Sequence, residues 1–501
     1  MASGRDLGWL LDGRAQQRAE HPFLVWEPFD GPSRTWTYGE LAHRSRQLAA
    51  GMQRRGLAAG DRALIHLDNS PEFLLAWFAC ARLGAVPVCT NTRSVAAELA
   101  FFAEHAGVVA AVTEESYASL VSAAAPGLGW VAIAPFADLY ADADDLVAFS
   151  PGPWAPASIQ YTSGTTSRPK AVVWTHANCL WAAKVSAAHE ALRDDDVHLV
   201  HLPLFHTNAQ SYSVLASLWA GATVVLQPKF SASRFWDVSL RNRCTWTSMV
   251  PFCNRALAER DVPERHSYRC WGSGSRSARD DARFGVRTIA WWGMTETVTH
   301  GIVDDIADPG ARFGCGRAAP EYDIAVNRDD GSPVEPGETG ALYVRGIPGL
   351  SLFAGYLHDA EATAAAVDEA GWLDTGDRVT VHPDGSIASV DRVKDVLKVG
   401  GENVSASEVE LVCRVPGVRD VAVVGTPDPM LTEVPVAFIV VSGDGAVIAR
   451  EVLAACRERL APFKVPREVR VVDELPRAAL DKVAKAELRQ LLRTQTVSID
   501  E

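Results

Sequence analysis

A run of small hydroxyl and glycine residues that ends in a lysine is the first segment whose residue types could do chemistry. Residues 161–170 read YTSGTTSRPK and follow the strand-like ASIQY. Small residues let backbone N–H groups approach an anion, hydroxyls donate to phosphate oxygens, and Lys170 adds a positive charge. The G-x-x-x-x-G-K-[ST] pattern of P-loop proteins is absent. The segment suggests a phosphate-binding loop of another kind, although such a run on its own is more often an ordinary loop.

Four further segments carry side chains suited to chemistry. They are HLPLFHTNAQSYS at 201–213, WWGMTETV at 291–298, GWLDTGDRV at 371–379 and LPRAALDKVAKAELR at 475–489. A hard carboxylate such as Glu296 suits Mg²⁺, and Asp377 can accept hydrogen bonds from two hydroxyls. Taken singly, an aspartate in a T-G-D turn or a lysine in a solvated tail is usually structural. The residues alone therefore leave both interpretations open.

Taken together and in order, these segments resemble the motifs of the adenylate-forming superfamily, which includes acyl- and aryl-CoA ligases, firefly luciferase and peptide-synthetase adenylation domains. The resemblance extends from TWTYGEL at 35–41 to the C-terminal lysine. It implies that ATP with Mg²⁺ activates a small carboxylic acid, and that CoA is the acceptor. The chain departs from the usual glycines or tyrosine of the family at Ser167, Ala171, Trp292 and Asp481.

The resemblance gives a role to each matched position. Lys482 would bridge the acid and the α-phosphate, His206 would close the carboxylate pocket, Thr295 would contact the α-phosphate and Glu296 would hold Mg²⁺. Among the positions matched to nucleotide or CoA contacts, Trp292 would flank the adenine. The whole set is Thr162, Ser163, Gly164, Thr165, Thr166, Lys170, Ser273, Gly274, Ser275, Trp291, Trp292, Gly293, Met294, Asp377, Arg392, Lys398, Gly400 and Gly401.

Outside that set, Asp391 and Lys394 match the hinge of the family, about which a C-terminal lid domain rotates. Lys464 and Arg467 are cations that could meet the phosphates of CoA. The resemblance thus implies a large N-terminal adenylation domain, residues 1–391, and a small mobile α+β lid domain, residues 392–501, that carries Lys482.

Four hypotheses about function stay open at this point. The leading one is an acid–CoA ligase. The second is an adenylating enzyme with an amine acceptor in secondary metabolism, including ATP-dependent diazotases that activate nitrite. The third is a stand-alone loader of a carrier protein. The fourth is a non-catalytic nucleotide-binding relative, which the intact Glu296, Asp377, Arg392 and Lys482 disfavour.

Alternating strands and helices must position these motifs. Strand-like runs are expected at 34–38, 63–67, 86–90, 108–113, 171–174, 197–201 and 222–226, and a helix is expected over 39–56. In the helix-like 67–85, Ser70 suits the N-cap and Pro71 the first turn. This β-α-β alternation indicates parallel or mixed sheets flanked by helices. From about 320 to 395, short alternating runs with turns such as Asp384-Gly385 predict a β-rich subdomain, and an α+β unit follows.

The composition limits the number of domains, the class of partner and the cellular compartment. The 501 residues exceed what one hydrophobic core holds, and the net charge of −14 argues against a nucleic-acid partner. Nine cysteines without C-x-x-C spacing indicate reduced thiols in a cytoplasmic protein. The N-terminus MASGRDLGWLLDGR lacks a signal-peptide pattern, and no apolar run reaches the roughly 18 residues of a membrane span. A monomer or homodimer is expected.

Overall fold

The structure is a computed structural model that describes residues 5–147, 149–162, 169–274, 276–307, 314–392, 396–476 and 483–496. The chain divides into two compact units. The first comprises the residues up to Thr92, Phe102–Tyr161 and Ala171–Asp391, and the second comprises Arg93–Phe101, Thr162–Lys170 and the residues from Arg392 onward.

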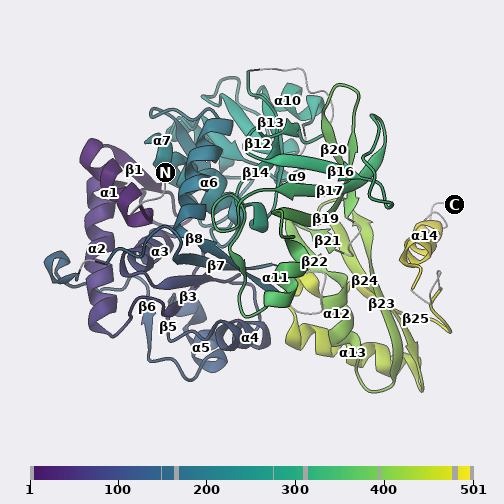
Figure 1. The fold of residues 1–501 in the computed structure, drawn as a ribbon. Helices are drawn as coiled ribbons and strands as arrows, with labels where there is room; N and C mark the ends of the chain where they lie inside the picture. The colour runs from purple at the N-terminus through teal and green to yellow at the C-terminus, as the bar shows by residue number, and fades with distance from the viewer. Residues whose placement is uncertain are drawn as a thin grey trace. The chain divides into compact units, whose positions relative to one another are not determined.

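Three sheets, within the described residues, account for the strands before the C-terminal region (Figure 1). The nine-stranded sheet runs in the order β15 (Arg317–Ala318), β14 (His300–Val303), β13 (Thr288–Gly293), β12 (Cys270–Ser273), β11 (Trp246–Ser248), β9 (Val197–Val200), β10 (Thr223–Leu226), β1 (Pro22–Trp26), β2 (Arg34–Thr37). The seven-stranded sheet runs β18 (Gly355–Tyr356), β8 (Lys170–Thr175), β7 (Pro156–Thr162), β4 (Val86–Cys89), β3 (Arg62–His66), β5 (Ala110–Thr113), β6 (Trp130–Ile133). The four-stranded sheet runs β16 (Asp323–Asn327), β17 (Thr339–Arg345), β19 (Trp372–Val381), β20 (Ile387–Arg392).

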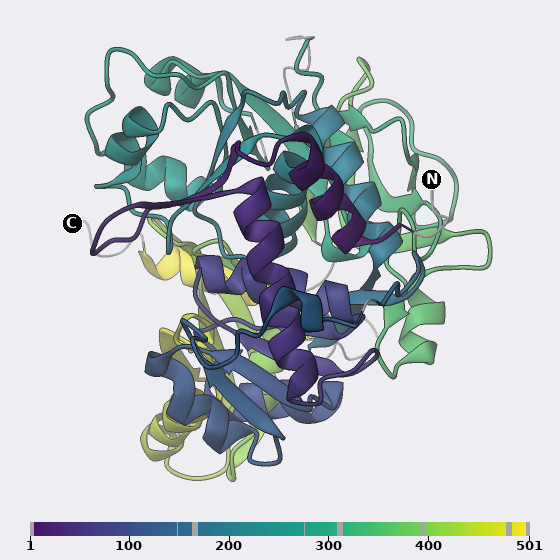
Figure 2. The same ribbon diagram turned by 90° about the vertical axis from the view of Figure 1, so that its left-hand side faces the viewer.

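Helices separate most of these strands along the chain. They are α1 (Leu7–Gln17), α2 (Tyr38–Arg54), α3 (Pro71–Leu83), α4 (Ala96–Ala106), α5 (Glu115–Ala124), α6 (His176–His189), α7 (Ala216–Ala220), α8 (Phe235–Arg241), α9 (Pro251–Ala258), α10 (Ala278–Phe284) and α11 (Ala360–Ala366). Short 3-10 or π-helical turns are η1 (Ala143–Asp145), η2 (Asn208–Leu215) and η3 (Thr295–Thr297). The purple helices α1, α2 and α3 pack side by side (Figure 2).

Local sequence signals explain where two of these helices begin. Thr37 and Glu40 form a capping box at α2, since each side chain accepts a hydrogen bond from the backbone of the other residue. The expected strand 34–38 therefore ends at Thr37, and Tyr38 already belongs to the helix. At α3, the Ser70 hydroxyl accepts from the backbone N–H of Phe73, as the predicted N-cap requires.

The predicted fold class is confirmed, because parallel strands with helical connections are joined by a β-rich part. β9, β10, β11, β12 and β13 pair in parallel, whereas β14 turns back antiparallel to β13. The β-rich region is the antiparallel sheet of β16, β17, β19 and β20. Asp384 and Gly385 lie between β19 and β20, where a turn was expected.

The second unit contains a sheet in the order β22 (Glu402–Ser405), β21 (Val396–Val399), β24 (Thr432–Val441), β23 (Val418–Asp428), with β25 (Glu468–Val471) also on β24. Its helices are α12 (Ala406–Cys413), α13 (Gly445–Arg459), η4 (Pro462–Lys464) and α14 (Lys485–Thr496). Gly400 and Gly401 connect β21 to β22 with φ of +59° and +92°. A type I′ hairpin turn requires positive φ at both central residues. The geometry of this turn therefore explains why both positions are glycine.

The nine cysteines are all buried and free, which agrees with the expectation of reduced thiols. Helices in the described ranges are too short or too polar for any of them to cross a bilayer.

Close packing between β12 and β13 makes Gly272 essential to the nine-stranded sheet. A Cβ atom at this position would lie 1.6 Å from Cη2 of Trp291, whose indole is buried against the strand. We expect Gly272→Ala to lower the free energy of unfolding by about 3 kcal/mol or more, because neither the strand backbone nor the buried indole can move easily. Urea denaturation followed by circular dichroism measures this loss.

Gly274→Ala is the matched control, because a Cβ atom there meets nothing within 4 Å in the part of the chain that the structure describes. Equal stability of the two variants would contradict the packing argument.

Candidate functional site

Several predicted positions follow the carboxyl ends of neighbouring parallel strands. His206 lies beyond β9, Gly274 directly follows β12, and Thr295 begins η3 just after β13. In open α/β sheets, ligands bind outside the carboxyl ends of the strands. The candidate site therefore lies at this edge of the nine-stranded sheet, where Ser273 ends β12 and Gly293 ends β13.

A buried hydrogen bond brings two of the predicted nucleotide contacts together. Nε1 of Trp292 donates to Oδ2 of Asp377 over 2.8 Å, although the two residues are 85 positions apart. Both side chains are at least nine-tenths buried. A tyrosine, which is common in the family at the position of Trp292, has no N–H group. The tryptophan thus departs from the family pattern in a way that ties the indole to the carboxylate.

Thr295 is held by two side chains that the sequence did not single out for that task. The hydroxyl of Thr207 lies 3.2 Å from the hydroxyl of Thr295, and Nε1 of Trp174 donates to the Thr295 carbonyl oxygen over 2.8 Å. Thr207 also donates to Oε1 of Gln160, whose amide donates to Gln210. This network joins the segment after His206 to the segment that follows β13.

Glu296, the predicted magnesium ligand, is buried, and Tyr356 is a partner of its side chain. The hydroxyl of Tyr356 donates to Oε1 of Glu296 over 2.9 Å. Burial, together with the nearby Glu296 carboxylate, raises the pKa of Tyr356 well above its usual range, so the phenol stays a donor. This hydrogen bond orients the carboxylate.

The donor set near Glu296 fits Mg²⁺ bound in the manner of nucleotide enzymes. The described residues contain no group of three His, Cys, Asp or Glu side chains that could hold a metal by themselves. Mg²⁺ commonly takes one or two carboxylates and completes its shell with water and substrate phosphates. One oriented carboxylate is therefore sufficient if the nucleotide supplies the other oxygens.

Other predicted residues lie elsewhere or outside the described ranges. Thr162 ends β7 and Lys170 begins β8, while His206 is half-buried with its ring beside Phe205. Lys398 is exposed on β21 of the second unit. Trp291 and Met294 flank the Trp292-Gly293 pair. Asp391 and Arg392 lie on β20 with undescribed side chains, and Ser163, Gly164, Thr165, Thr166, Ser275, Lys394 and Lys482 lie outside the described residues.

The expected contact of Lys464 with a CoA phosphate is wrong. Nζ of Lys464 lies 2.7 Å from Oε1 of Glu408, and Lys464 is only 8% exposed. Burial alone would lower its pKa, but the carboxylates of Glu408 and Glu98 together outweigh burial and raise it. Arg467 pairs with Asp428 but keeps an exposed side chain.

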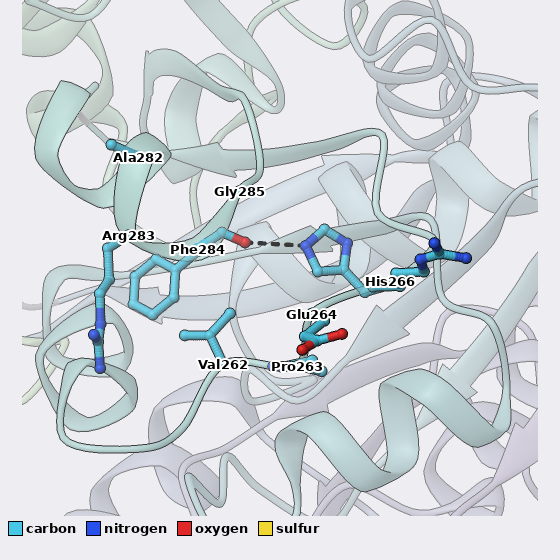
Figure 3. Close-up of a pocket in the computed structure, with 9 residues that line it drawn as sticks. Val262, Pro263, Glu264, His266, Ala282, Arg283, Phe284 and Gly285 are labelled. Carbon is cyan, nitrogen blue, oxygen red and sulfur yellow. Dashed lines mark hydrogen bonds between the residues drawn. The ribbon is translucent and has the colours of Figure 1, made fainter.

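Two cavities of the first unit are lined by residues other than Trp292 and Asp377. One of about 620 Å³ is lined by Val262, Pro263, Glu264, Arg265, His266, Ala282, Arg283, Phe284 and Gly285 (Figure 3). Its His266 ring is held by the Phe284 carbonyl, and none of its residues belongs to a motif. The other, of about 700 Å³, includes Tyr356 in its wall. The second cavity therefore adjoins the residue that orients Glu296.

The hydrogen bond between Trp292 and Asp377 leads to a prediction about the stability of the folded protein. Trp292→Phe keeps an aromatic ring but leaves the buried Asp377 carboxylate without the indole donor. We expect it to lower the free energy of unfolding by about 1–3 kcal/mol more than a tryptophan-to-phenylalanine change that breaks no hydrogen bond. Trp271→Phe is that control, because Trp271 is fully buried and its N–H has no partner among the described residues. Equal losses in urea denaturation would contradict the importance of this bond.

Comparisons with known proteins show the family of this chain. The AMP-binding enzyme family matches residues 11–357, and the AMP-binding enzyme C-terminal domain matches residues 409–482. The crotonobetaine/carnitine–CoA ligase of Salmonella enteritidis PT4 (strain P125109) is 33% identical, over 98% of this chain and 100% of its own length.

Solved structures of CoA ligases are also similar to this chain. A double mutant of o-succinylbenzoate CoA synthetase from Bacillus subtilis, bound to a product analogue, has a TM-score of 0.83 at 30% identity, covering 96% of this chain and 98% of that one. A benzoate CoA ligase from Burkholderia xenovorans LB400 has a TM-score of 0.71 at 25% identity, covering 97% and 100%. The chain belongs to the AMP-binding enzyme family, and the resemblance seen in its motifs is thereby confirmed.

Proposed function

We propose that this protein is an ATP-dependent acid–CoA ligase that adenylates a small carboxylic acid and passes the acyl group to CoA. Family membership and the CoA-ligase relatives support the two half-reactions. The single observation that carries the nucleotide role is the buried Trp292–Asp377 hydrogen bond. It fixes the aromatic ring assigned to adenine beside the carboxylate assigned to ribose.

In the first half-reaction, a carboxylate oxygen of the acid attacks the α-phosphorus of ATP, and pyrophosphate leaves. Positioning and charge stabilisation supply most of the rate, because the protein does little covalent work. Thr295 is held for this purpose by Thr207 and Trp174, and Glu296 is held by Tyr356. Bound Mg²⁺ would offset the negative charge of the phosphates, and Lys482 would do so at the α-phosphate.

In the second half-reaction, the thiol sulfur of CoA attacks the carbonyl carbon of the acyl adenylate, and AMP leaves with its electron pair. The thiol proton is released. We further propose that the protein works as a monomer or homodimer in the cytoplasm, where ATP and CoA are abundant. Nine free cysteines fit such a reducing compartment.

A pyrophosphate-release assay tests the function. With Mg·ATP and a panel of small aliphatic and aryl acids, we expect release with at least one acid, AMP as the nucleotide product, and a thioester when CoA is added. Chelation of Mg²⁺ should stop release.

Parallel reactions replace the acid with nitrite, or CoA with an amine or a carrier protein. Release that requires nitrite and occurs with no acid would overturn the CoA-ligase proposal. Absence of release with every acid and with nitrite would favour a non-catalytic protein.

Lys482→Ala separates the half-reactions. Loss of the ammonium should reduce adenylate formation at least about 1,000-fold, because the charge that develops at the α-phosphate loses its partner. Thioester formation from supplied acyl adenylate and CoA should change less than about threefold. Lys229→Ala, which removes an exposed lysine outside all the motifs, is the control. Equal loss of both half-reactions would contradict the assignment of Lys482 to adenylation alone.

A further inference from the structure

Two buried glutamine side chains of the first unit form a chain of hydrogen bonds that ends at Thr295. Nε2 of Gln160, on β7, donates to Oε1 of Gln210, in η2, over 3.0 Å. Nε2 of Gln210 donates to the carbonyl oxygen of Leu204 over 2.7 Å. The Thr207 hydroxyl donates to Oε1 of Gln160 over 3.0 Å and lies 3.2 Å from the hydroxyl of Thr295. The family resemblance assigns a role in the reaction to neither glutamine.

The Leu204 carbonyl oxygen fixes how both amide groups are turned. A carbonyl oxygen only accepts hydrogen bonds, so the amide nitrogen of Gln210 must face it, and Oε1 of Gln210 then faces Gln160. Gln160 in turn must donate through Nε2 to Gln210, which leaves its own Oε1 for the Thr207 hydroxyl. Amides and hydroxyls do not titrate near neutral pH. The direction of the chain up to Thr207 is therefore fixed by geometry and does not change with pH.

The chain runs from the core to the candidate site. Gln210, Gln160 and Thr207 are 0%, 2% and 8% exposed, whereas Thr295 is half-buried. A buried amide destabilises the folded protein unless its polar atoms are paired, and here the nitrogen and the oxygen of each amide have partners. A fully paired network of this kind is rigid. The Thr207 hydroxyl is thereby held in one place.

The chain of hydrogen bonds connects three stretches that carry predicted site residues. Gln160 lies two residues before the end of β7, at Thr162. Thr207 directly follows His206, and Thr295 begins η3. These stretches meet only in the folded protein, so no continuous segment fixes their spacing. A displacement of about 1 Å at a group far from the reacting atoms can slow an enzyme about 100-fold. Loss of this network should therefore affect the rate of reaction as well as stability.

We propose that Gln160 and Gln210 are positioning residues for adenylation. They hold the Thr207 hydroxyl, and this hydroxyl holds the side chain of Thr295. Neither glutamine touches a substrate in this role. Trp174 holds the carbonyl oxygen of Thr295 over 2.8 Å, so the backbone and the side chain of one residue are both fixed. This inference rests on the proposed function, because it takes Thr295 to contact the α-phosphate of ATP.

The burst of pyrophosphate in the absence of CoA tests the proposal, with Mg·ATP and an acid that the wild-type protein adenylates. The amplitude of the burst counts active sites, and its rate constant reports the adenylation step. Gln160→Leu should lower the rate constant about tenfold or more, because Thr207 loses its acceptor and no longer fixes Thr295. The amplitude per folded molecule should stay the same, with the folded fraction measured by circular dichroism. A merely structural role would lower the amplitude and leave the rate constant unchanged.

Gln227→Leu is the matched control. Gln227 follows β10, is 1% exposed, and has both amide atoms without a partner among the described residues. Its rate constant should stay within about twofold of the wild-type value, because no hydrogen bond to a site residue is lost. Thr207→Val breaks the bond to Gln160 from the other side and should lower the rate constant as Gln160→Leu does. Thr207→Ser keeps the hydroxyl and should restore most of the rate.

The double variant of Gln160→Leu and Thr207→Val should be within about twofold of the slower single variant, since both changes break the same chain of hydrogen bonds. Three results would overturn the proposal while leaving the acid–CoA ligase intact. They are effects of the two changes that multiply, a wild-type rate constant in Gln160→Leu, and an equal loss in Gln227→Leu. If the wild-type protein releases no pyrophosphate with any acid, the proposed function itself fails, and the inference fails with it.

Discussion

The hydrogen bond from Trp292 to Asp377 is the interaction on which the rest of the candidate site depends. It joins β13 of the nine-stranded sheet to β19 of the four-stranded antiparallel sheet, and both partners are buried. Leaving either polar group without its partner would destabilise this contact. The hydrogen bond therefore holds the two sheets together at this point. Trp292 stands three residues before Thr295 and four before Glu296, and the same contact therefore fixes where the phosphate-side residues lie.

Around this bond, hydrogen bonds between polar side chains add to the hydrophobic packing of Trp292. Thr207 and Trp174 hold Thr295, and Tyr356 holds Glu296. Such networks are rigid when every member is satisfied, because a partly satisfied network in a low dielectric is unfavourable. Rigid placement matters for phosphoryl chemistry, in which positioning and charge supply most of the rate.

Much of the fold could be predicted from local sequence, whereas the roles of the candidate site residues stay predictions. Ser70 and Pro71 mark the start of α3, and the apolar runs at 63–67 and 86–90 became paired parallel strands. Local patterns suffice there because caps and strand periodicity act over a few residues. They did not predict that Lys464 would be buried beside Glu408, since a lysine 56 positions from its partner carries no local sign of pairing.

The sequence by itself determined the family, because the order of the motifs survives in the linear chain, and it determined the residue types available for chemistry. Only the tertiary structure decided which of those residues meet. Asp377 could have been a turn residue until the fold placed its carboxylate at the indole N–H of Trp292, and Tyr356 belonged to no motif. The physical reason is that hydrogen bonds across 60 to 85 residues depend on the closure of sheets and the burial of their faces, which no local pattern records.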